Sequence, residues 1–130
     1  LRRLYLVFLS AKFQRISHII DIHKSLGPGL LEKVYEEVLC YELSENNFNF
    51  KRQSPVPVTY EGISLPLGFI ADIIVENKVL IELKSVETVH PVHKKQLLTY
   101  LKLTKIKLGL LINFNEVLLK DGITRIVNNL

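Results

Sequence analysis

The feature that most constrains the fold is a pair of apolar segments, residues 67–75 and 79–86, joined by the short polar connection Glu76-Asn77-Lys78. Apolar and β-branched segments of this length on either side of a tight turn predict two antiparallel strands of one hairpin. If the turn is centred near Asn77, residues whose numbers sum to about 154 lie opposite each other. Asp72 then pairs with Glu82, so two carboxylates lie side by side in strands that are otherwise apolar.

Two neighbouring carboxylates in an apolar sheet repel each other and are costly to bury unless a cation lies between them. Mg²⁺ and Mn²⁺ prefer such hard oxygen ligands, and Asp72, Glu82 and the backbone carbonyl of Leu83 can supply them. Lys84 lies on the same face of its strand as Glu82, two residues away. Its ammonium group can orient a water molecule and stabilise phosphoryl charge. The alternative is that Glu82 and Lys84 are simply an exposed charge pair on a half-solvated sheet.

Two predicted helices contain further candidates for the same site. In the helix predicted from Pro91 to about residue 103, Gln96 and Tyr100 share a face, with His93 one turn earlier. Gln96 and Tyr100 can direct polar groups toward phosphate or water, although Tyr100 also fits an ordinary core aromatic. Glu32, in the first turn of an earlier helix, is a further candidate acid, although an acid there also suits the helix dipole.

The charge distribution is compatible with a polyanionic partner. The formal net charge is +4, and residues 88–115 contain no acidic side chain. Basic residues in this stretch that could hold a phosphodiester backbone are His93, Lys94, Lys95 and Lys102. An ordinary solvated helix face explains the same pattern equally well.

The chain of 130 residues is long enough for one hydrophobic core. We expect residues 1–11 to form an N-terminal tail and residues 12–130 to form a single domain. No segment approaches the roughly 18 consecutive apolar residues of a membrane span. Cys40 is the single cysteine and cannot form an internal disulfide, which favours a cytoplasmic location.

Hydrophobic periodicity predicts the order α-α-β-β-β-α-β-β, which is that of an α/β fold. The two first helices are separated by the helix-breaking run Gly27-Pro28-Gly29. Pro55 and Pro57 place the first strand at a sheet edge. The predicted helices cover residues 12–26, 30–46 and 91–103, and the predicted strands cover residues 48–60, 67–75, 79–86, 106–114 and 123–127.

Several separated motifs occur in an order typical of one known family. Gly29, Glu32 and Tyr35 form a G-x-x-E-x-x-Y pattern, and further matching segments are residues 68–72, 81–84, 91–101 and 109–114. In these motifs the chain resembles the GxxExxY proteins, a family of the PD-(D/E)XK nuclease superfamily. The resemblance extends over residues 12 to about 127, which is nearly the whole chain.

This resemblance implies a restriction-endonuclease-like (PD-(D/E)XK) core with a mixed sheet flanked by helices. It also implies hydrolysis of phosphodiester bonds with Mg²⁺ or Mn²⁺, in DNA or alternatively in RNA. The implied catalytic residues are Asp72, Glu82, Lys84, Glu32, Gln96 and Tyr100, and the implied metal ligands are Asp72, Glu82, Leu83 and Glu32.

Three further expectations follow from the resemblance. A homodimer is compatible with it, because many enzymes of the superfamily dimerise. The family commonly has an arginine immediately before the Ala-Asp pair, where this chain has Ile70. A module that keeps the fold and binds nucleic acid or protein without catalysis is therefore the alternative function.

Overall fold

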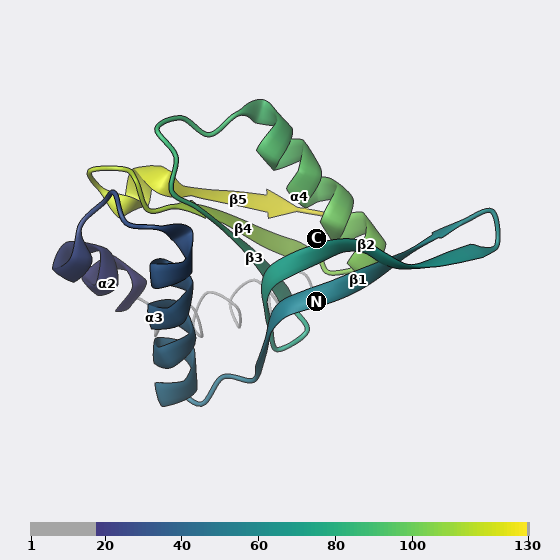
Figure 1. The fold of residues 1–130 in the computed structure, drawn as a ribbon, viewed down its shortest axis with the longest axis horizontal. Coiled ribbons are helices and arrows are strands. Elements are labelled where there is room, and N and C mark those ends of the chain that lie inside the picture. The colour runs from purple at the N-terminus through teal and green to yellow at the C-terminus, as the bar shows by residue number, and fades with distance from the viewer. Residues whose placement is uncertain (1–17, 130) are drawn as a thin grey trace.

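The computed structural model describes residues 18–129, which form one sheet with helices on both faces (Figure 1). The order of helices and strands predicted from the sequence is confirmed. The predicted tail, residues 1–11, and residues 12–17 of the first predicted helix lie outside the described residues. The elements are α2 (His18–Leu26), α3 (Glu32–Glu45), β1 (Phe50–Tyr60), β2 (Ile63–Val75), β3 (Val79–Lys84), α4 (Pro91–Thr104), β4 (Leu108–Asn113), the 3₁₀ helix η1 (Leu119–Gly122) and β5 (Ile123–Val127).

The sheet is mixed, as expected, and its strand order is β1-β2-β3-β4-β5. β3 and β4 run parallel, because α4 returns the chain between them, and the other neighbours are antiparallel. The expected edge position of β1 is confirmed. In the β2–β3 hairpin Ile73 pairs with Ile81 and Val75 pairs with Val79, which confirms the predicted register.

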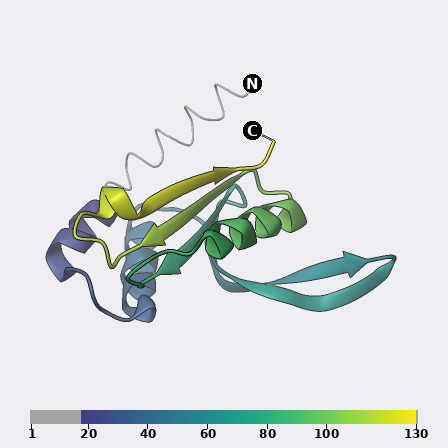
Figure 2. The same ribbon diagram turned by 90° about the horizontal axis from the view of Figure 1, so that it is seen from above.

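Helices α2 and α3 cover one face of the sheet and α4 covers the other (Figures 1 and 2). Tyr35, Leu39 and Leu43 of α3 pack on the first face, and Leu97 and Leu101 of α4 pack on the second. Each face therefore has its own apolar cluster, and the hydrophobic effect holds the sheet from both sides. Among the described residues, no helix is long and apolar enough to cross a membrane.

Four strands differ in length from the prediction, and the first of them, β1, begins at Phe50 rather than at residue 48. β2 begins at Ile63 rather than at residue 67, because Glu61 (φ 47°) and Gly62 (φ 80°) form a two-residue turn that pairs Tyr60 directly with Ile63. Positive φ at both turn residues suits the twist of a hairpin. β3 ends at Lys84 rather than at residue 86, and β4 covers Leu108–Asn113 rather than residues 106–114.

The β1–β2 hairpin changes face at Gln53. Phe50 packs with the α3-side cluster, whereas Val56 packs with the α4-side cluster. Gln53 lies between them with φ 48°, the left-handed region that a non-glycine residue rarely adopts. This backbone turn rotates the outer part of the hairpin relative to its inner part, and it lies directly beside Asp72 in the neighbouring strand.

Candidate active site

Asp72 and Glu82 lie side by side, as their register predicted, where β2 and β3 separate. The ladder between β2 and β3 ends on this side with the pair of Ile73 and Ile81. Beyond it each carboxylate accepts a hydrogen bond from the backbone of the other strand. The Asp72 amide donates to Glu82 Oε1 (3.3 Å), and the Leu83 amide donates to Asp72 Oδ2 (2.8 Å). These bonds fix both acids at the point where the sheet opens.

The environment of Glu82 disfavours its charged form. Burial, followed by the nearby charge of Asp72, raises the pKa of Glu82 to about 8, against an ordinary value of 4.5. Burial raises the pKa of the Tyr100 hydroxyl, and the charges of Glu82 and Asp72 raise it further. Tyr100 is therefore close enough to the carboxylate pair to interact with it electrostatically. The site therefore holds two carboxyl groups together in a poorly solvated place, where Glu82 resists ionisation.

This raised pKa makes a stability prediction for the metal-free protein. Glu82 is protonated in the fold up to a pH of about 8 but ionises near 4.5 when unfolded. Its contribution to stability is therefore present below pH 4.5 and is lost as the pH rises toward 8. Glu82→Gln removes this dependence. In EDTA, we expect urea unfolding to show the variant gaining about 2 kcal/mol on the parent between about pH 5 and pH 8. An identical pH dependence in the two proteins would contradict the buried, charge-coupled state of Glu82.

Lys84 is placed on the α4 side of β3, the face that Glu82 shares. The charge of Lys84 acts on His93 of α4, whose pKa is lowered by burial, then by Lys84 and His90, and is raised by Glu32. His93, Lys84 and Glu32 are thus close enough to interact electrically at the carboxyl end of β3. The carboxyl ends of parallel strands are where α/β proteins commonly place their sites.

The G-x-x-E-x-x-Y segment holds this end of β3 in place. Tyr35 is fully buried, and its hydroxyl donates to the Gly27 carbonyl (2.6 Å) and accepts from the Leu30 amide (3.1 Å). Glu32 accepts a hydrogen bond from the Ser85 amide (3.3 Å), and the Ser85 hydroxyl donates to the Leu30 carbonyl (2.7 Å). The loop before α3 is therefore tied to the residue that follows Lys84.

Residues that the sequence analysis did not identify connect Asp72 to α3. The side-chain amide nitrogen of Gln53 (Nε2) donates to Asp72 Oδ1 (3.4 Å) and to Glu36 Oε1. Glu36 is only 7% exposed, and Arg52 donates to its Oε2 from Nε (3.1 Å) and from the terminal nitrogen (3.0 Å). A chain of polar contacts thus runs from Arg52 through Glu36 and Gln53 to the carboxylate of Asp72.

Asn113, at the end of β4, is a further residue that the sequence analysis did not identify. Its buried side chain accepts from the Val86 amide (3.1 Å) and donates to the Val86 carbonyl (2.9 Å). These two bonds continue the strand pairing beyond the end of β3 and orient the segment after Lys84. A buried asparagine within an apolar run, Leu108–Asn113, is the sequence signal that could have identified it.

Helix α4 presents different residues on its different sides. Tyr100 stacks on Phe69 of β2, with ring centroids 3.7 Å apart and planes 5° apart, and so faces the carboxylates. Gln96 is exposed one turn earlier, on the same side by helical spacing. Lys94 and Lys95 are exposed, but the helical repeat directs them away from the side of Tyr100.

Lys102 lies at the opposite end of the central strands from Lys84 and the carboxylate pair. With Lys105, Lys107 and Asn128 it lines a shallow basic hollow at the amino end of β4. Lys84 pairs with Asn113, at the carboxyl end of β4. The structure therefore separates Lys102 from the carboxylate pair, although only two positions separate it from Tyr100 in the sequence.

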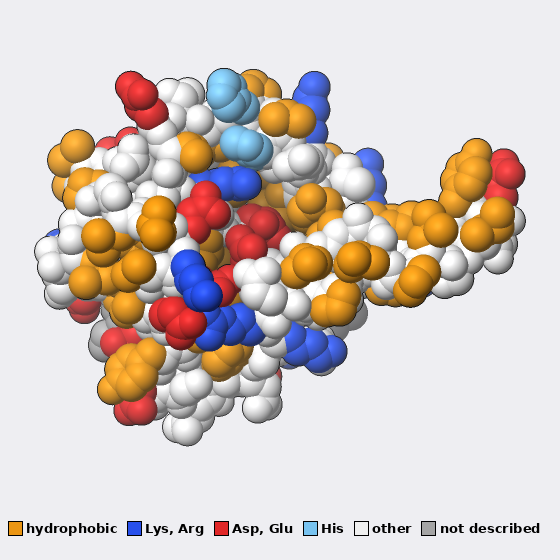
Figure 3. Space-filling model, in the orientation of Figure 1, with side chains coloured by type: hydrophobic (Ala, Val, Ile, Leu, Met, Phe, Trp, Pro, Cys, Tyr) orange, Lys and Arg blue, Asp and Glu red, His pale blue; other side chains and the backbone are white. Residues whose placement is uncertain are grey.

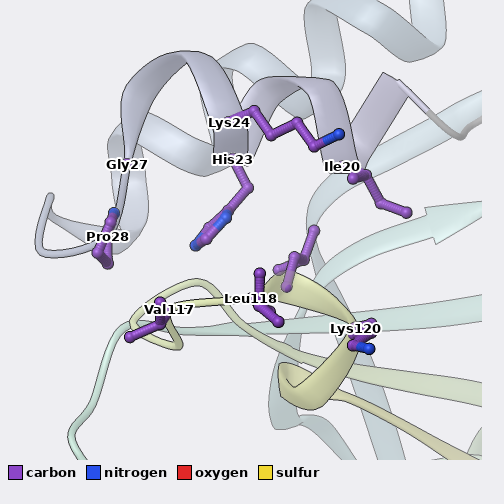
Figure 4. Close-up of a pocket in the computed structure, with 9 residues that line it drawn as sticks. Ile20, His23, Lys24, Gly27, Pro28, Val117, Leu118 and Lys120 are labelled. Atoms are coloured by element: carbon purple, nitrogen blue, oxygen red, sulfur yellow. The ribbon is translucent and has the colours of Figure 1, made fainter.

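A larger cavity lies away from these residues. It has a volume of about 500 Å³ and lies between α2 and the loop that follows β4 (Figure 4). Ile20, Val117 and Leu118 line it with His23, whose Nε2 is 3.1 Å from the Phe114 carbonyl oxygen. His23 is thus engaged with the backbone of a neighbouring segment, and no acidic residue lines this cavity among the described residues.

The candidate site is the hollow in which acidic side chains gather beside basic and histidine side chains in Figure 3.

Cys40 has no chemical role that the structure supports. It is buried within α3, and burial raises the pKa of its thiol to about 11. A thiol with this pKa is a poor nucleophile at neutral pH.

The structure also bears on whether a third ligand joins the two carboxylates. In residues 18–129 no three His, Cys, Asp or Glu side chains lie together as a metal cluster, so Glu32 does not join Asp72 and Glu82 in one group.

The comparison with family models decides the relationship. The model described as the PD-(D/E)XK nuclease superfamily matches residues 11–126, most of the chain. The chain belongs to the PD-(D/E)XK nuclease superfamily. The search of curated proteins gives no match. Membership of the PD-(D/E)XK superfamily agrees with the fold class that the sequence predicts.

Proposed function

We propose that this protein is a divalent-metal-dependent nuclease that hydrolyses phosphodiester bonds in DNA, and that it is a GxxExxY member of its superfamily. One observation carries the proposal. Asp72 and Glu82 exchange hydrogen bonds with each other's strands, and Lys84 follows Glu82 on the same face. RNA is a second substrate to test, because the proposed site acts on the phosphodiester group, which DNA and RNA share.

The donor set fits Mg²⁺ or Mn²⁺. Asp72 and Glu82 offer hard oxygen atoms, and burial beside Asp72 raises the pKa of Glu82, an effect that a cation between the two carboxylates would reverse. A divalent cation bound here would neutralise phosphate charge and lower the pKa of water at the site. The carbonyl of Leu83 and the carboxylate of Glu32 are the proposed additional ligands, although Glu32 would have to leave the Ser85 amide to take part.

The side chains around the carboxylates have distinct proposed roles in hydrolysis. The Lys84 ammonium orients the attacking water and stabilises the negative charge that develops on the phosphoryl oxygens. As the oxygen of that water forms a new bond to phosphorus, the water gives up one proton, one P–O ester bond breaks, and the leaving oxygen takes up a proton. Tyr100 and Gln96 hold water or phosphate oxygen from the α4 side.

The proposed contacts with the nucleic acid lie on both sides of α4. His93, whose pKa the charge of Lys84 helps to lower, is the proposed contact with the phosphate next to the reacting one. Lys94, Lys95 and Lys102 would contact phosphates farther along the strand, and such contacts make affinity fall as salt rises. Ile70 is 49% exposed and offers no charge at the position where the family commonly has arginine.

A buried free thiol at Cys40 is consistent with a proposed cytoplasmic location.

A metal titration separates this function from the alternative, a non-catalytic binding module. We expect calorimetry to show saturable Mn²⁺ binding to the parent protein, and binding weakened by at least about 30-fold in Asp72→Asn, because one charged ligand is lost. The amide oxygen of the substituted asparagine can still accept the hydrogen bond from the Leu83 amide, so this variant keeps the local fold. A parent protein that binds no Mn²⁺ or Mg²⁺ up to about 10⁻² M, weaker than the weakest physiological sites, would favour the binding module.

A further inference from the structure

Gln53 has a backbone conformation that a regular strand does not require. Its φ is 48°, in the left-handed region that costs free energy for a residue with a side chain. It lies within β1, directly opposite Asp72 in the register of the β1–β2 pair. A strained backbone that the fold keeps beside a candidate metal ligand points to a functional reason for it.

The conformation brings the side chains of Arg52 and Gln53 to the same side of β1. Successive side chains of a regular strand point to opposite faces. Arg52 nevertheless donates to Glu36 Oε2 from two of its nitrogens, and Gln53 Nε2 donates to Glu36 Oε1. Two neighbouring residues of one strand therefore reach the same carboxylate of α3, and the left-handed φ of Gln53 explains how both can do so.

Asp72 lies where β2 makes a matching change of face. Ala71 packs in the α4-side cluster, whereas Ile73, two residues further, packs in the α3-side cluster. Residues two apart in a regular strand share a face, so β2 rotates between them. Both strands of the hairpin therefore rotate at the point where Gln53 lies opposite Asp72.

The side chain of Gln53 holds one oxygen of the Asp72 carboxylate. Its Nε2 carries two hydrogen atoms, so it can donate to Glu36 Oε1 and to Asp72 Oδ1 (3.4 Å) together. Glu36 is buried and is itself fixed by Arg52, so it anchors the amide on the α3 side. The other oxygen of Asp72, Oδ2, accepts from the Leu83 amide (2.8 Å). Each oxygen of Asp72 therefore faces a donor, one from β1 and one from β3.

A simpler role for Gln53 would be to tie β1 to α3. Arg52 already makes that connection, because it donates to Glu36 and also to the exposed carboxylate of Glu37. A further tie between the same two elements would not require a contact with Asp72. The contact with Asp72 is therefore the feature that a purely structural role leaves unexplained.

We propose that Gln53 is a positioning residue for Asp72: its left-handed backbone turns its amide onto the Asp72 carboxylate and restricts how that carboxylate rotates. The inference rests on the proposed function, in which Asp72 is a metal ligand, and deepens it. Hydrogen-bond partners of a ligating carboxylate orient it for the metal, and their loss weakens metal binding. Gln53 itself contacts neither metal nor substrate in this account and acts through Asp72 alone.

Gln53→Gly separates the side chain from the backbone. Glycine adopts positive φ without strain, so this variant can keep the path of β1 while it loses the amide. The matched control is Asn47→Gly, which makes the same kind of change at an exposed residue with φ 62° in the turn after α3. Circular dichroism and urea unfolding in EDTA should show two folded proteins with cooperative transitions.

Hydrogen exchange of the Leu83 amide, followed by NMR in EDTA, tests the positioning without metal or activity. This amide donates to Asp72 Oδ2, so its protection reports how firmly the carboxylate is held. We expect Gln53→Gly to raise its exchange rate at least about tenfold, and the nearby Val86 amide to change by less than about threefold. Asn47→Gly should change neither rate. An unchanged rate at Leu83 in Gln53→Gly, or equal acceleration of both amides, would overturn the proposal.

Calorimetry with Mn²⁺ connects the positioning to the metal. We expect Gln53→Gly to bind Mn²⁺ about tenfold more weakly than the parent, as is usual when a partner of a metal ligand is lost, and Asn47→Gly to bind as the parent does. Equal Mn²⁺ affinity in Gln53→Gly and a parent that binds the metal would show that Gln53 does not position Asp72 for it. A parent that binds no Mn²⁺, with faster exchange of Leu83 in Gln53→Gly, would instead reject the proposed function and support the positioning of Asp72.

Discussion

Replacing Lys84 with alanine is expected to lower the rate of phosphodiester cleavage by about 10²- to 10³-fold while the affinity for Mn²⁺ changes by less than about threefold. The reason is that Lys84 shares a face with Glu82 but is not itself a proposed ligand, so its loss removes charge stabilisation and leaves both carboxylates in place. Single-turnover cleavage of end-labelled DNA gives the rate, and calorimetry gives the affinity.

The control for Lys84→Ala is Lys120→Ala. Lys120 is an exposed lysine on η1, which lies by the cavity of Figure 4 rather than by the carboxylates. We expect this variant to cleave at the parent rate. If Lys84→Ala cleaves as fast as Lys120→Ala, the proposed role of Lys84 is wrong.

The second large effect is on stability. Arg52→Met is expected to lower the free energy of unfolding by about 3 kcal/mol, because it leaves the buried carboxylate of Glu36 without its cationic partner. Removing one member of a buried pair is costly, whereas removing both charges is not. Urea denaturation of the metal-free protein measures the loss.

Two variants make this stability test specific. Arg52→Met combined with Glu36→Gln should recover more than half of the lost stability, because the carboxylate charge disappears with its partner. Arg125→Met, on the edge strand β5, should change the free energy of unfolding by less than about 0.5 kcal/mol. A double variant as unstable as Arg52→Met would show that packing of the Arg52 side chain, and not its charge, stabilises α3 against β1.

The carboxylate pair could be predicted because its geometry is local. Side chains alternate along a strand, and a short turn fixes which residues of a hairpin oppose each other. The turn around Asn77 therefore placed Asp72 beside Glu82 without knowledge of any distant contact. The order of β3, α4 and β4 was accessible for a similar reason, since each element has its own periodicity, but their parallel pairing was not predicted from the residues.

The polar chain from Arg52 to Asp72 could not be predicted in the same way. It joins α3 to β1 and β2, and cross-element pairs leave no periodic pattern in one sequence. It also depends on the left-handed backbone of Gln53. A glycine at this position would have suggested a positive φ, whereas a glutamine does not. The start of β2 was missed because Pro66 and Gly68 resemble loop residues.

The position of Lys102 shows the limit of proximity in sequence. It is two residues from Tyr100, yet the direction of α4 and the helical repeat take it to the basic hollow with Lys105 and Lys107. The grouping of basic residues in the sequence thus combined His93, which interacts with Lys84, with lysines at the opposite end of the strands.

The most direct test of the central claim is cleavage by the purified protein. Single- and double-stranded DNA and RNA are incubated with the parent protein in Mg²⁺, in Mn²⁺ and in EDTA, beside Asp72→Ala prepared identically. We predict metal-dependent cleavage of DNA by the parent, no cleavage in EDTA, and a loss of at least about 10³-fold in Asp72→Ala. Cleavage that persists in Asp72→Ala, or a parent that binds Mn²⁺ but cleaves none of these substrates, would contradict the assignment of Asp72, Glu82 and Lys84 as a nuclease site.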